Sequence, residues 1–377
     1  MLAYISLTLL LAGAYYFLIT FLLSAWDSHP DHLHGTTPDP DLGVTILIPA
    51  RNEAANLQAC VDSILAAAAQ VQNSLEIIIV DDHSEDGSYE LAMSIADSRI
   101  KVLRLADHLQ ESTHPHNAYK KLALQYGLSH ASHDHVIQLD ADVIVPTTYL
   151  DSILRVLATH QPDFLAAPVL LTGSSRLEQF QILDLMGMMA VTAAGIRTGR
   201  WHMANGANMS YPKAQVHYED SAMASGDDVS TVQRLAEAGG DILFLKGLSA
   251  TVRTAAMPTL SSLWRQRLRW ATKNKYQSSA QMKVMMAIPF LNCLLLLGHP
   301  FLSLFFGEVA WVLLCIHLFI KLAIDYVYLK QLSEDFGVEA VMRSYWYASV
   351  LHVLYIALVG LASLVVRRYV WKGRQVS

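Results

Sequence analysis

The sequence predicts an α/β domain with a mostly parallel sheet, placed between segments that span a membrane. Residues 2–25 carry no charged side chain, and three further apolar segments lie near residues 284–306, 309–329 and 346–366. Between them, over residues 43–170, strand-like and helix-like patterns alternate. Strands that alternate with helices form βαβ units, in which helices cover both faces of a parallel sheet.

The composition also indicates a membrane protein with a soluble part. Of the 377 residues, 53% are hydrophobic and only 16% are charged, whereas soluble domains carry about 25% charged residues. The formal net charge of −6 argues against a nucleic-acid-binding protein. Cys60, Cys293 and Cys315 match neither a disulfide framework nor a zinc site, which indicates that the main domain lies on the reducing, cytoplasmic side of its membrane.

The first 26 residues are expected to form a retained membrane anchor, because the uncharged stretch is long enough to cross a bilayer as a helix. The alternative is a signal peptide, which would need a basic start and a small-residue cleavage site, and neither is clear here. Residues 27–42 are rich in Pro, Asp and His and are expected to form a linker.

Residues 43–258 are expected to form the α/β domain. Its clearest strand is 76–80, because four β-branched residues in succession are typical of a buried parallel strand. Residues 172–258 show a less regular pattern, apart from a return strand expected at 241–252. The other expected strands are 44–48, 100–105, 136–139 and 164–171, and the expected helices are 53–70, 89–96, 119–130 and 148–159.

Acidic residues follow two of these strands. Asp81 and Asp82 come at the end of the strand at 76–80, and Asp140 and Asp142 come directly after the strand at 136–139. In parallel α/β sheets, ligands bind outside the carboxyl ends of the strands, so we expect these carboxylates at a ligand site. The alternative is that they only cap the helices that follow.

Asp140 and Asp142 are candidate metal ligands. Two carboxylates so closely spaced can both approach one Mg²⁺ or Mn²⁺ ion, with phosphate oxygens of a ligand completing the shell. Such an ion can neutralise the charge that develops on a diphosphate leaving group. The alternative for an isolated D-x-D pattern is a hydrated turn with two surface aspartates.

Residues 259–282 are expected to form a basic amphipathic helix that suits the membrane surface. At about 100° per residue, Gln266, Arg269 and Trp270 fall on one face of this helix. The other face carries the apolar residues Leu260, Leu263, Trp264, Leu268 and Ala271.

The membrane region is expected over residues 283–366, followed by a basic tail at 367–377. If the first helix runs inward, three full spans would leave this tail outside, against the positive-inside rule. The segment Gly298-His299-Pro300 interrupts the first apolar stretch. We therefore expect residues 284–306 to be re-entrant, interfacial or split into two shorter helices, which would keep the tail on the cytoplasmic side.

An ordered series of motifs runs between residues 43 and 280. The motifs are Pro49-Ala50-Arg51-Asn52-Glu53, Asp81-Asp82 with Ser84-x-Asp86-Gly87, Lys120-Lys121, Asp140-Ala141-Asp142, Asn205-Gly206-Ala207-Asn208, Gly226-Asp227-Asp228 and Gln266-Arg267-Leu268-Arg269-Trp270. Each motif alone is common, but the ordered set is specific. The series resembles the family-2 inverting glycosyltransferases with the GT-A fold. It is similar to their membrane-anchored bacterial branch, which is related to ceramide glucosyltransferase and to the cellulose and hyaluronan synthases.

The resemblance implies a nucleotide-sugar site with a divalent cation, Mg²⁺ or Mn²⁺. It implies that the uridine and ribose of a UDP-sugar are held by Pro49, Ala50, Glu53 and Asp82. Lys121, or its neighbour Lys120, would help to hold the donor near its phosphates. Asp140 would contact the donor, and Asp142 would bind the metal together with Asp140.

The resemblance also assigns a general base and an acceptor site. The family's base motif usually reads Thr/Ser-Glu-Asp, whereas this chain has Gly226-Asp227-Asp228. Asp228, the last carboxylate of the triplet, is the expected base, and Asp227 remains the alternative. The residues that would face the acceptor and the diphosphate are Asn205, Gln266, Arg269 and Trp270.

The function predicted from the sequence is a membrane-bound glycosyltransferase, in a bacterial inner membrane, whose catalytic domain is cytoplasmic. Three or four apolar segments are few for threading a polymer, so the expected acceptor is a lipid or a lipid-linked sugar. A non-catalytic nucleotide-sugar-binding scaffold is the alternative, although such a protein should have lost the base or metal carboxylates. A nucleotidyltransferase is disfavoured because Pro49-Ala50-Arg51-Asn52-Glu53 contains no glycine.

Overall fold

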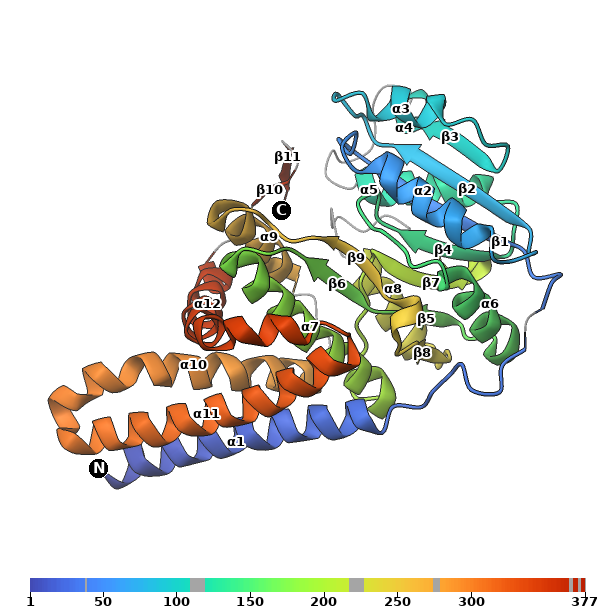
Figure 1. Cartoon of the computed structure of the whole chain (residues 1–377). Coiled ribbons are helices and arrows are strands. Elements are labelled where there is room, and N and C mark those ends of the chain that lie inside the picture. The colour runs from blue at the N-terminus through green and yellow to red at the C-terminus, as the bar shows by residue number, and fades with distance from the viewer. Residues whose placement is uncertain are drawn as a thin grey trace. The chain divides into compact units, whose positions relative to one another are not determined.

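The computed structural model describes residues 1–37, 39–108, 119–216, 227–273, 279–365, 369–371 and 374–376 (Figure 1). The chain divides into two compact units. The membrane-helix unit comprises Met1–His29, Leu171–Trp201 and Ala256–Arg367. The sheet unit comprises Pro30–Leu170, His202–Ala255 and Arg368–Ser377.

The sheet unit contains a seven-stranded sheet in the order β3-β2-β1-β4-β7-β5-β8. Strands β3, β2, β1 and β4 are parallel to one another, and β7 runs antiparallel to its neighbours β4 and β5. The mostly parallel sheet predicted from the sequence is therefore confirmed. The strands are β1 (Val44–Ala50), β2 (Leu75–Asp81), β3 (Ile100–Arg104), β4 (His135–Leu139), β5 (Phe164–Ala166), β7 (Asn208–Pro212) and β8 (Ile242–Phe244).

Helices pack against this sheet where small residues permit close approach. A Cβ atom at Gly127 of α5 would lie 2.2 Å from Leu47 Cδ1 of β1, so a larger residue there would displace the Leu47 side chain. The helices of this unit are α2 (Leu57–Ala68), α3 (Ser88–Ser94), α4 (Leu105–His108), α5 (Tyr119–His130), α6 (Tyr149–His160) and α8 (Asp227–Glu237), with the 3-10 turns η1 (Lys213–Gln215) and η2 (Leu248–Ala250).

Two single strands expected from the sequence are each interrupted. Residues 164–171 form β5 and then β6 (Val169–Thr172), with Pro168 between them, because proline has no N–H to donate to a sheet ladder. Residues 241–252 form β8 and then η2, and β9 (Val252–Ala255) begins only afterwards. Strands β6 and β9 pair in a separate two-stranded sheet, as do β10 (Tyr369–Trp371) and β11 (Arg374–Val376).

The membrane-helix unit contains a long helix that the sequence pattern did not suggest. It lies within residues expected to be irregular, and its first turn has a capping box in which Ser175 and Glu178 bond each other's backbone N–H. Gly199 ends it in the left-handed conformation. The helices of this unit are α1 (Leu2–Asp27), α7 (Arg176–Thr198), α9 (Leu260–Lys273), α10 (Ala280–Phe306), α11 (Glu308–Asp335) and α12 (Tyr345–Val365), with η4 (Glu339–Ser344) before α12.

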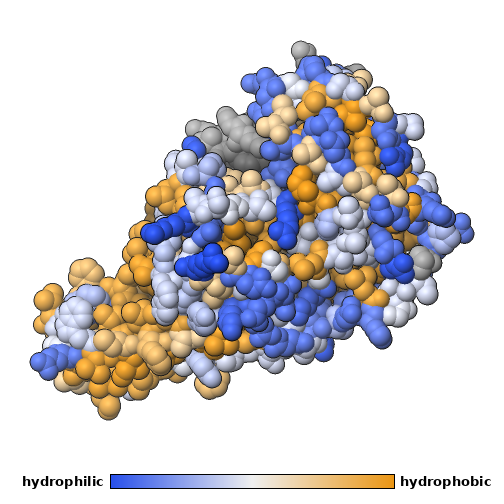
Figure 2. All heavy atoms as spheres, in the orientation of Figure 1, coloured by the Kyte–Doolittle hydropathy of each residue, from blue (hydrophilic) through white to orange (hydrophobic). Residues whose placement is uncertain are grey.

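Within the described residues, five helices are long and apolar enough to cross a membrane: α1, α7, α10, α11 and the segment from Glu339 to Val365. On the face shown in Figure 2, apolar atoms cover the end of the α1, α10 and α11 bundle. Exposed aromatic side chains on this bundle include Phe17, Phe301 and Phe319. Their exposure is what a lipid-facing surface requires.

Helix α10 is continuous, so the expected division of residues 284–306 into two shorter helices is wrong. Pro289 and Pro300 both lie inside it, and neighbouring membrane helices allow such prolines to be tolerated. Figure 1 shows α1, α10 and α11 side by side, whereas α12 is seen nearly end-on. Helix α12 thus crosses the direction of the other three.

A chain of buried polar groups runs through the bundle. Asp325 of α11 accepts a hydrogen bond from the Tyr15 hydroxyl of α1 at 2.7 Å and forms an ion pair with Lys321. His317 lies one helical turn before Lys321, and its Nδ1 is 3.1 Å from Nε2 of His299 on α10. These contacts join α1, α10 and α11 by polar bonds inside an otherwise apolar bundle.

Candidate functional site

The polar residues after β1, β2 and β4 share one edge of the sheet. These strands are parallel neighbours, and Ala50 at the end of β1 lies opposite Asp81 at the end of β2. The backbone N–H of Asp82 donates to the carbonyl of Ala50 at 2.8 Å. The residues predicted to bind the donor, Pro49, Ala50 and Asp82, are therefore brought together by strand register.

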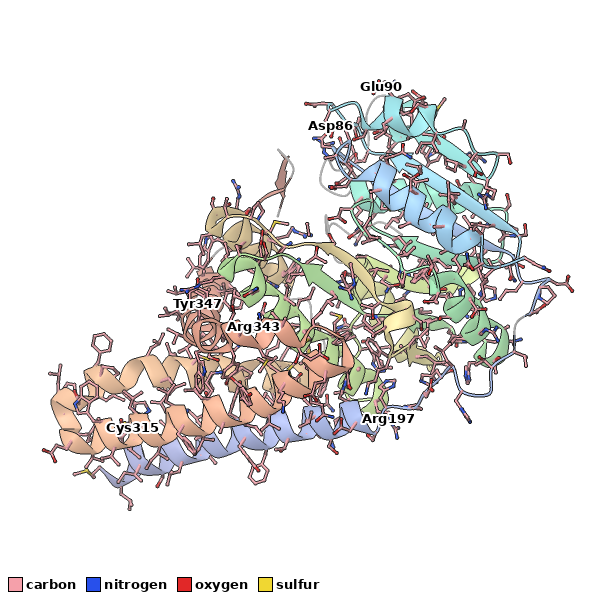
Figure 3. All side chains as sticks on the ribbon, in the orientation of Figure 1. Asp86, Glu90, Arg197, Cys315, Arg343 and Tyr347 are labelled. Atoms are coloured by element: carbon pink, nitrogen blue, oxygen red, sulfur yellow. The ribbon has the colours of Figure 1, made fainter. Side chains whose placement is uncertain are left out.

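Hydrogen bonds join the loop after β1 to the loop after β2. The backbone N–H groups of Asn52 and Glu53 donate to the hydroxyls of Ser84 (3.0 Å) and Ser88 (2.7 Å). The N–H of Ala54 donates to Asp86 Oδ2 at 3.0 Å. Figure 3 labels Asp86 in this loop. The Ser84-x-Asp86-Gly87 pattern thus has a structural role, because its Ser84 and Asp86 side chains accept hydrogen bonds from the backbone that precedes α2.

The electrostatics of this loop favour ionised Asp86. Partial burial acts to raise the pKa of its carboxyl, but hydrogen bonds from Ser88 and Ala54 outweigh that effect and hold the pKa below its usual value. Glu53, predicted to bind the nucleotide, accepts a hydrogen bond from Asn56 Nδ2 at 2.9 Å.

Asp81 and Asp82 are both buried but have different surroundings. Asp82 Oδ1 lies 3.7 Å from Arg51 Nη1 and 3.0 Å from His83 Nδ1. Asp81 Oδ1 has no hydrogen-bond partner among the residues that the structure describes. A buried carboxylate oxygen without a partner is costly, which suits an atom that receives a donor group from a ligand. Asp81 is therefore a candidate ligand-binding residue beside Asp82, which the family resemblance had singled out.

Asp140 and Asp142 lie in the loop between β4 and α6, and each has a polar partner. Asp140 Oδ1 forms an ion pair with Lys120 Nζ at 2.8 Å. Asp142 Oδ2 accepts a hydrogen bond from the Thr254 hydroxyl of β9 at 3.1 Å. Of the two candidate lysines, Lys120 thus reaches the D-x-D motif, while Lys121 is buried in the same helix. No local pattern points to Thr254, because it is 112 residues from Asp142 in the chain.

A cysteine lies behind this motif. Cys60 Sγ is 3.8 Å from the carbonyl oxygen of Asp140. Burial, followed by the charge of Asp142, raises the pKa of the Cys60 thiol to about 12. The thiol is therefore protonated at neutral pH.

The donor set at this loop fits Mg²⁺ or Mn²⁺ better than a softer metal. Among the described residues, no group of three or more His, Cys, Asp and Glu side chains is placed to hold a metal. The carboxylates of Asp140 and Asp142 alone would leave coordination positions open, as hard cations bound together with substrate phosphates require.

A hydrogen bond to the segment just before β7 holds Asp228 at the same edge of the sheet. Asn208 begins β7 opposite Leu139, the last residue of β4. Just before it, the backbone N–H of Gly206 donates to Asp228 Oδ2 at 3.3 Å. Asp228 Oδ1 accepts from the N–H of Val229 at 2.8 Å. The side chain of Asp227, the alternative base, and residue Gly226 lie outside the described residues.

The two asparagines of the Asn205-Gly206-Ala207-Asn208 motif differ in role. Asn205, predicted near the acceptor, accepts a bond from the N–H of Ala207 at 3.1 Å and shapes the turn. Asn208 is fully buried, and its Nδ2 donates to the carbonyls of Pro168 (2.8 Å) and Ala250 (2.9 Å). Asn208 therefore connects three segments of the sheet unit.

Gln266, Arg269 and Trp270 lie on α9 and so belong to the membrane-helix unit, whereas the other predicted site residues belong to the sheet unit. The apolar face expected for this helix is partly exposed, as a helix at a membrane surface would require, although its Leu263 is buried. Leu260 and Trp264 are 64% and 39% exposed, whereas Arg267 is only 2% exposed. An arginine is buried here because an aspartate of another helix, Asp184, forms an ion pair with it.

Sequence comparison identifies the family. The profile described as Glycosyl transferase family 2 matches residues 45–217, and that of Glycosyl transferase family group 2 matches residues 135–363, more than half of the chain. The chain belongs to the family-2 glycosyltransferases. The predicted family and the predicted GT-A fold are thereby confirmed.

Relatives of this glycosyltransferase include a poly-beta-1,6-N-acetyl-D-glucosamine synthase of Staphylococcus aureus, 27% identical over 246 residues, which cover 61% of this chain and 54% of the relative. The chain thus spans about half the length of the curated relatives it matches. An undecaprenyl-phosphate 4-deoxy-4-formamido-L-arabinose transferase of Aeromonas hydrophila is 35% identical over 103 residues, covering 27% of this chain and 30% of the relative.

Among solved structures, this glycosyltransferase resembles a mannosyltransferase from Pyrobaculum calidifontis in complex with GDP-Man and Mn²⁺. The two share 16% sequence identity with a TM-score of 0.54, and the match covers 97% of each chain. At this identity the likeness extends to the fold.

Proposed function

We propose that this protein is an inverting glycosyltransferase that moves a sugar from a nucleotide sugar, specifically a UDP-sugar, to a lipid or lipid-linked acceptor at the cytoplasmic leaflet of a bacterial inner membrane. The observation that carries the proposal is the gathering of Asp82, Asp140 and Asp228 at one edge of the sheet. Strand register places the first two, and the bond from Gly206 to Asp228 adds the third.

In this proposal the donor lies across the carboxyl ends of β1, β2 and β4. Pro49, Ala50, Glu53 and Asp82 hold the nucleoside. Lys120 faces the phosphates, because its ammonium already lies at Asp140. Asp140 and Asp142 would hold a Mg²⁺ or Mn²⁺ ion, which supplies positive charge against the departing diphosphate.

Asp228 acts as the general base. Its carboxylate takes the proton from the acceptor hydroxyl as that oxygen forms a bond to the anomeric carbon. The bond between this carbon and the diphosphate oxygen breaks from the opposite face, so the configuration inverts and the nucleoside diphosphate leaves. The N–H groups of Gly206 and Val229 fix the two carboxylate oxygens, which orients the base before the acceptor arrives.

We assign the acceptor and the diphosphate to Asn205, Gln266, Arg269 and Trp270. An arginine suits phosphate because its guanidinium can donate two parallel hydrogen bonds. A tryptophan offers an apolar plane for a sugar ring. A lipid acceptor is supported by α1, α10 and α11, which are long and apolar enough to cross a membrane and expose large apolar side chains.

The test is release of nucleoside diphosphate by purified protein in lipid nanodiscs, given a panel of UDP- and GDP-sugars, Mn²⁺ or Mg²⁺, and bacterial lipid extract. Asp228→Asn should abolish release, and Asp241→Asn, an exposed aspartate of the same unit, should not. Asp227→Asn distinguishes the alternative base. Absence of release by the unaltered protein, or equal activity of Asp228→Asn, would contradict the proposal and favour the non-catalytic scaffold.

Mass analysis of the products separates lipid glycosylation from polymer synthesis. The relatives in Staphylococcus aureus are polysaccharide synthases, so a polymer is the second candidate product. A lipid whose mass increases by one sugar supports the proposal, whereas a ladder of many additions would replace the lipid acceptor by a growing chain.

A further inference from the structure

Helix α9 turns a charged residue, Arg267, into the interior of the membrane-helix unit. Its Nη2 lies 2.8 Å from Asp184 Oδ2 of α7, and the two side chains are 2% and 8% exposed. Removing one member of a buried ion pair leaves an uncompensated charge, so loss of either residue should destabilise this unit. This pair ties the helix that carries Gln266, Arg269 and Trp270 to α7.

The same guanidinium packs on two aromatic rings. Its central carbon lies 4.3 Å from the ring centre of Trp270 on the same helix and 5.7 Å from that of Tyr355 on α12. The ring of Tyr355 in turn meets Phe180 of α7 edge-on, with centroids 5.6 Å apart. Arg267 is therefore shared by α7, α9 and α12, and one face of Trp270 rests on it.

The polar atoms around Arg267 are not saturated. Its Nε and Nη2, Asp184 Oδ2 and the neighbouring Gln266 Oε1 are buried without hydrogen-bond partners among the described residues, so the contact with Asp184 is an ion pair without a hydrogen bond. The orientation of the guanidinium thus depends on its ion pair and on ring stacking. A lysine would keep the charge but lose the flat surface that supports the indole.

We propose that Arg267 is a positioning residue. Held by Asp184, it fixes the plane of the Trp270 ring, and thereby the ring's presentation to the acceptor sugar. The inference rests on the proposed function, because contact between Trp270 and the acceptor sugar is itself part of that proposal. Neither Arg267 nor Asp184 was given a role by the motif pattern, in which Arg267 stands between Gln266 and Arg269.

The first test follows the environment of Trp270 by ¹⁹F NMR of protein labelled with 5-fluorotryptophan. The chain has seven tryptophans, and the Trp270 signal is the one lost in Trp270→Phe. We expect Arg267→Lys and Asp184→Asn to shift this signal and Arg265→Lys, an exposed arginine of the same helix, to leave it in place. A Trp270 signal that stays unmoved in Arg267→Lys would overturn the inference, whatever the activity.

The second test separates positioning from general stability. Arg267→Lys and Asp184→Asn should each lower kcat/KM for the acceptor about tenfold or more, since small displacements of a substrate-positioning group carry such costs. The KM for the nucleotide sugar should match that of Arg265→Lys. Equal changes in donor and acceptor KM would reveal a merely structural role. If the unaltered protein transfers no sugar, the proposed function fails, while the ¹⁹F result still decides whether Arg267 positions Trp270.

Discussion

The ammonium of Lys120 lies 2.8 Å from Oδ1 of Asp140, so a lysine side chain holds the first carboxylate of the D-x-D motif. A cation that binds Asp140 must compete with this ammonium. Lys120 comes from α5 and Asp140 from the end of β4, and the contact arises because both elements flank β1.

Lys120→Gln is expected to strengthen binding of Mn²⁺ alone, because the competing charge is removed. The pair is partly exposed, so the gain should be about two- to fivefold. Isothermal titration with Mn²⁺ measures it, and Lys120→Arg, which keeps the charge, serves as the control. Weaker Mn²⁺ binding by Lys120→Gln would contradict this competition.

Thr254→Val is expected to weaken Mn²⁺ binding by about tenfold, because Asp142 loses the hydroxyl that orients it. Valine has nearly the same shape, so packing is retained. Thr254→Ser keeps the hydroxyl and should bind Mn²⁺ as the unaltered protein does. If Thr254→Val and Thr254→Ser titrate alike, the bond to Asp142 is irrelevant to the metal.

Asp325→Ala is expected to destabilise the membrane bundle by about 3–5 kcal/mol, because it leaves the buried ammonium of Lys321 without its carboxylate. Lys330 and Glu334 form a matched, exposed pair on the same helix, at 3.7 Å, and Glu334→Ala should change stability by about 0.5 kcal/mol or less. Denaturant titration of the two variants in detergent compares their free energies of unfolding. Similar losses from both variants would show that burial of the first pair is unimportant.

Stability should depend on pH through Glu76. Partial burial acts to raise the pKa of this carboxyl, but hydrogen bonds from Ser132 and Thr45 outweigh it and hold the pKa below 4.5. Because the folded pKa is the lower one, the stabilisation is present above about pH 4.5 and is lost as pH falls through the folded value.

Glu76→Gln should therefore lower the free energy of unfolding at pH 7 by about 1 kcal/mol. The difference from the unaltered protein should shrink below pH 4. Thermal unfolding of both proteins at pH 7 and below pH 4 measures this difference in stability. A difference that is the same at both would mean that the charge of Glu76 does not matter.

The basic tail is expected on the cytoplasmic side, because α12 crosses the direction of α1, α10 and α11 and so need not span the bilayer with them. Figure 3 labels Arg343 and Tyr347 at the junction where η4 leads into α12. In a Cys315→Ser background, Ser377→Cys should resist an impermeant maleimide added to intact cells, and Gly307→Cys, at the α10–α11 turn, should react. Labelling at both positions would show that α12 spans the membrane.

The parts of the fold that follow local patterns could be predicted closely. The apolar run before Asp81 became β2, and residues 119–130 became α5, because period and turn residues act over short stretches. Helix α7 was missed although Ser175 and Glu178 form a capping box at its start, since a single S-x-x-E pattern is common. The burial of Arg267 in α9 was not foreseen, because its partner Asp184 lies 83 positions earlier in the chain.

By itself, the sequence determined the family, the order of strands and helices in the α/β part, the carboxylates that follow the strands and the presence of apolar segments, because each of these is written in neighbouring residues. The tertiary structure decided which oxygens have partners: Lys120 at Asp140, Thr254 at Asp142, Gly206 at Asp228 and Arg267 at Asp184. Such pairings depend on strand register and helix packing, which bring together groups that are remote in the chain, and no local pattern encodes them.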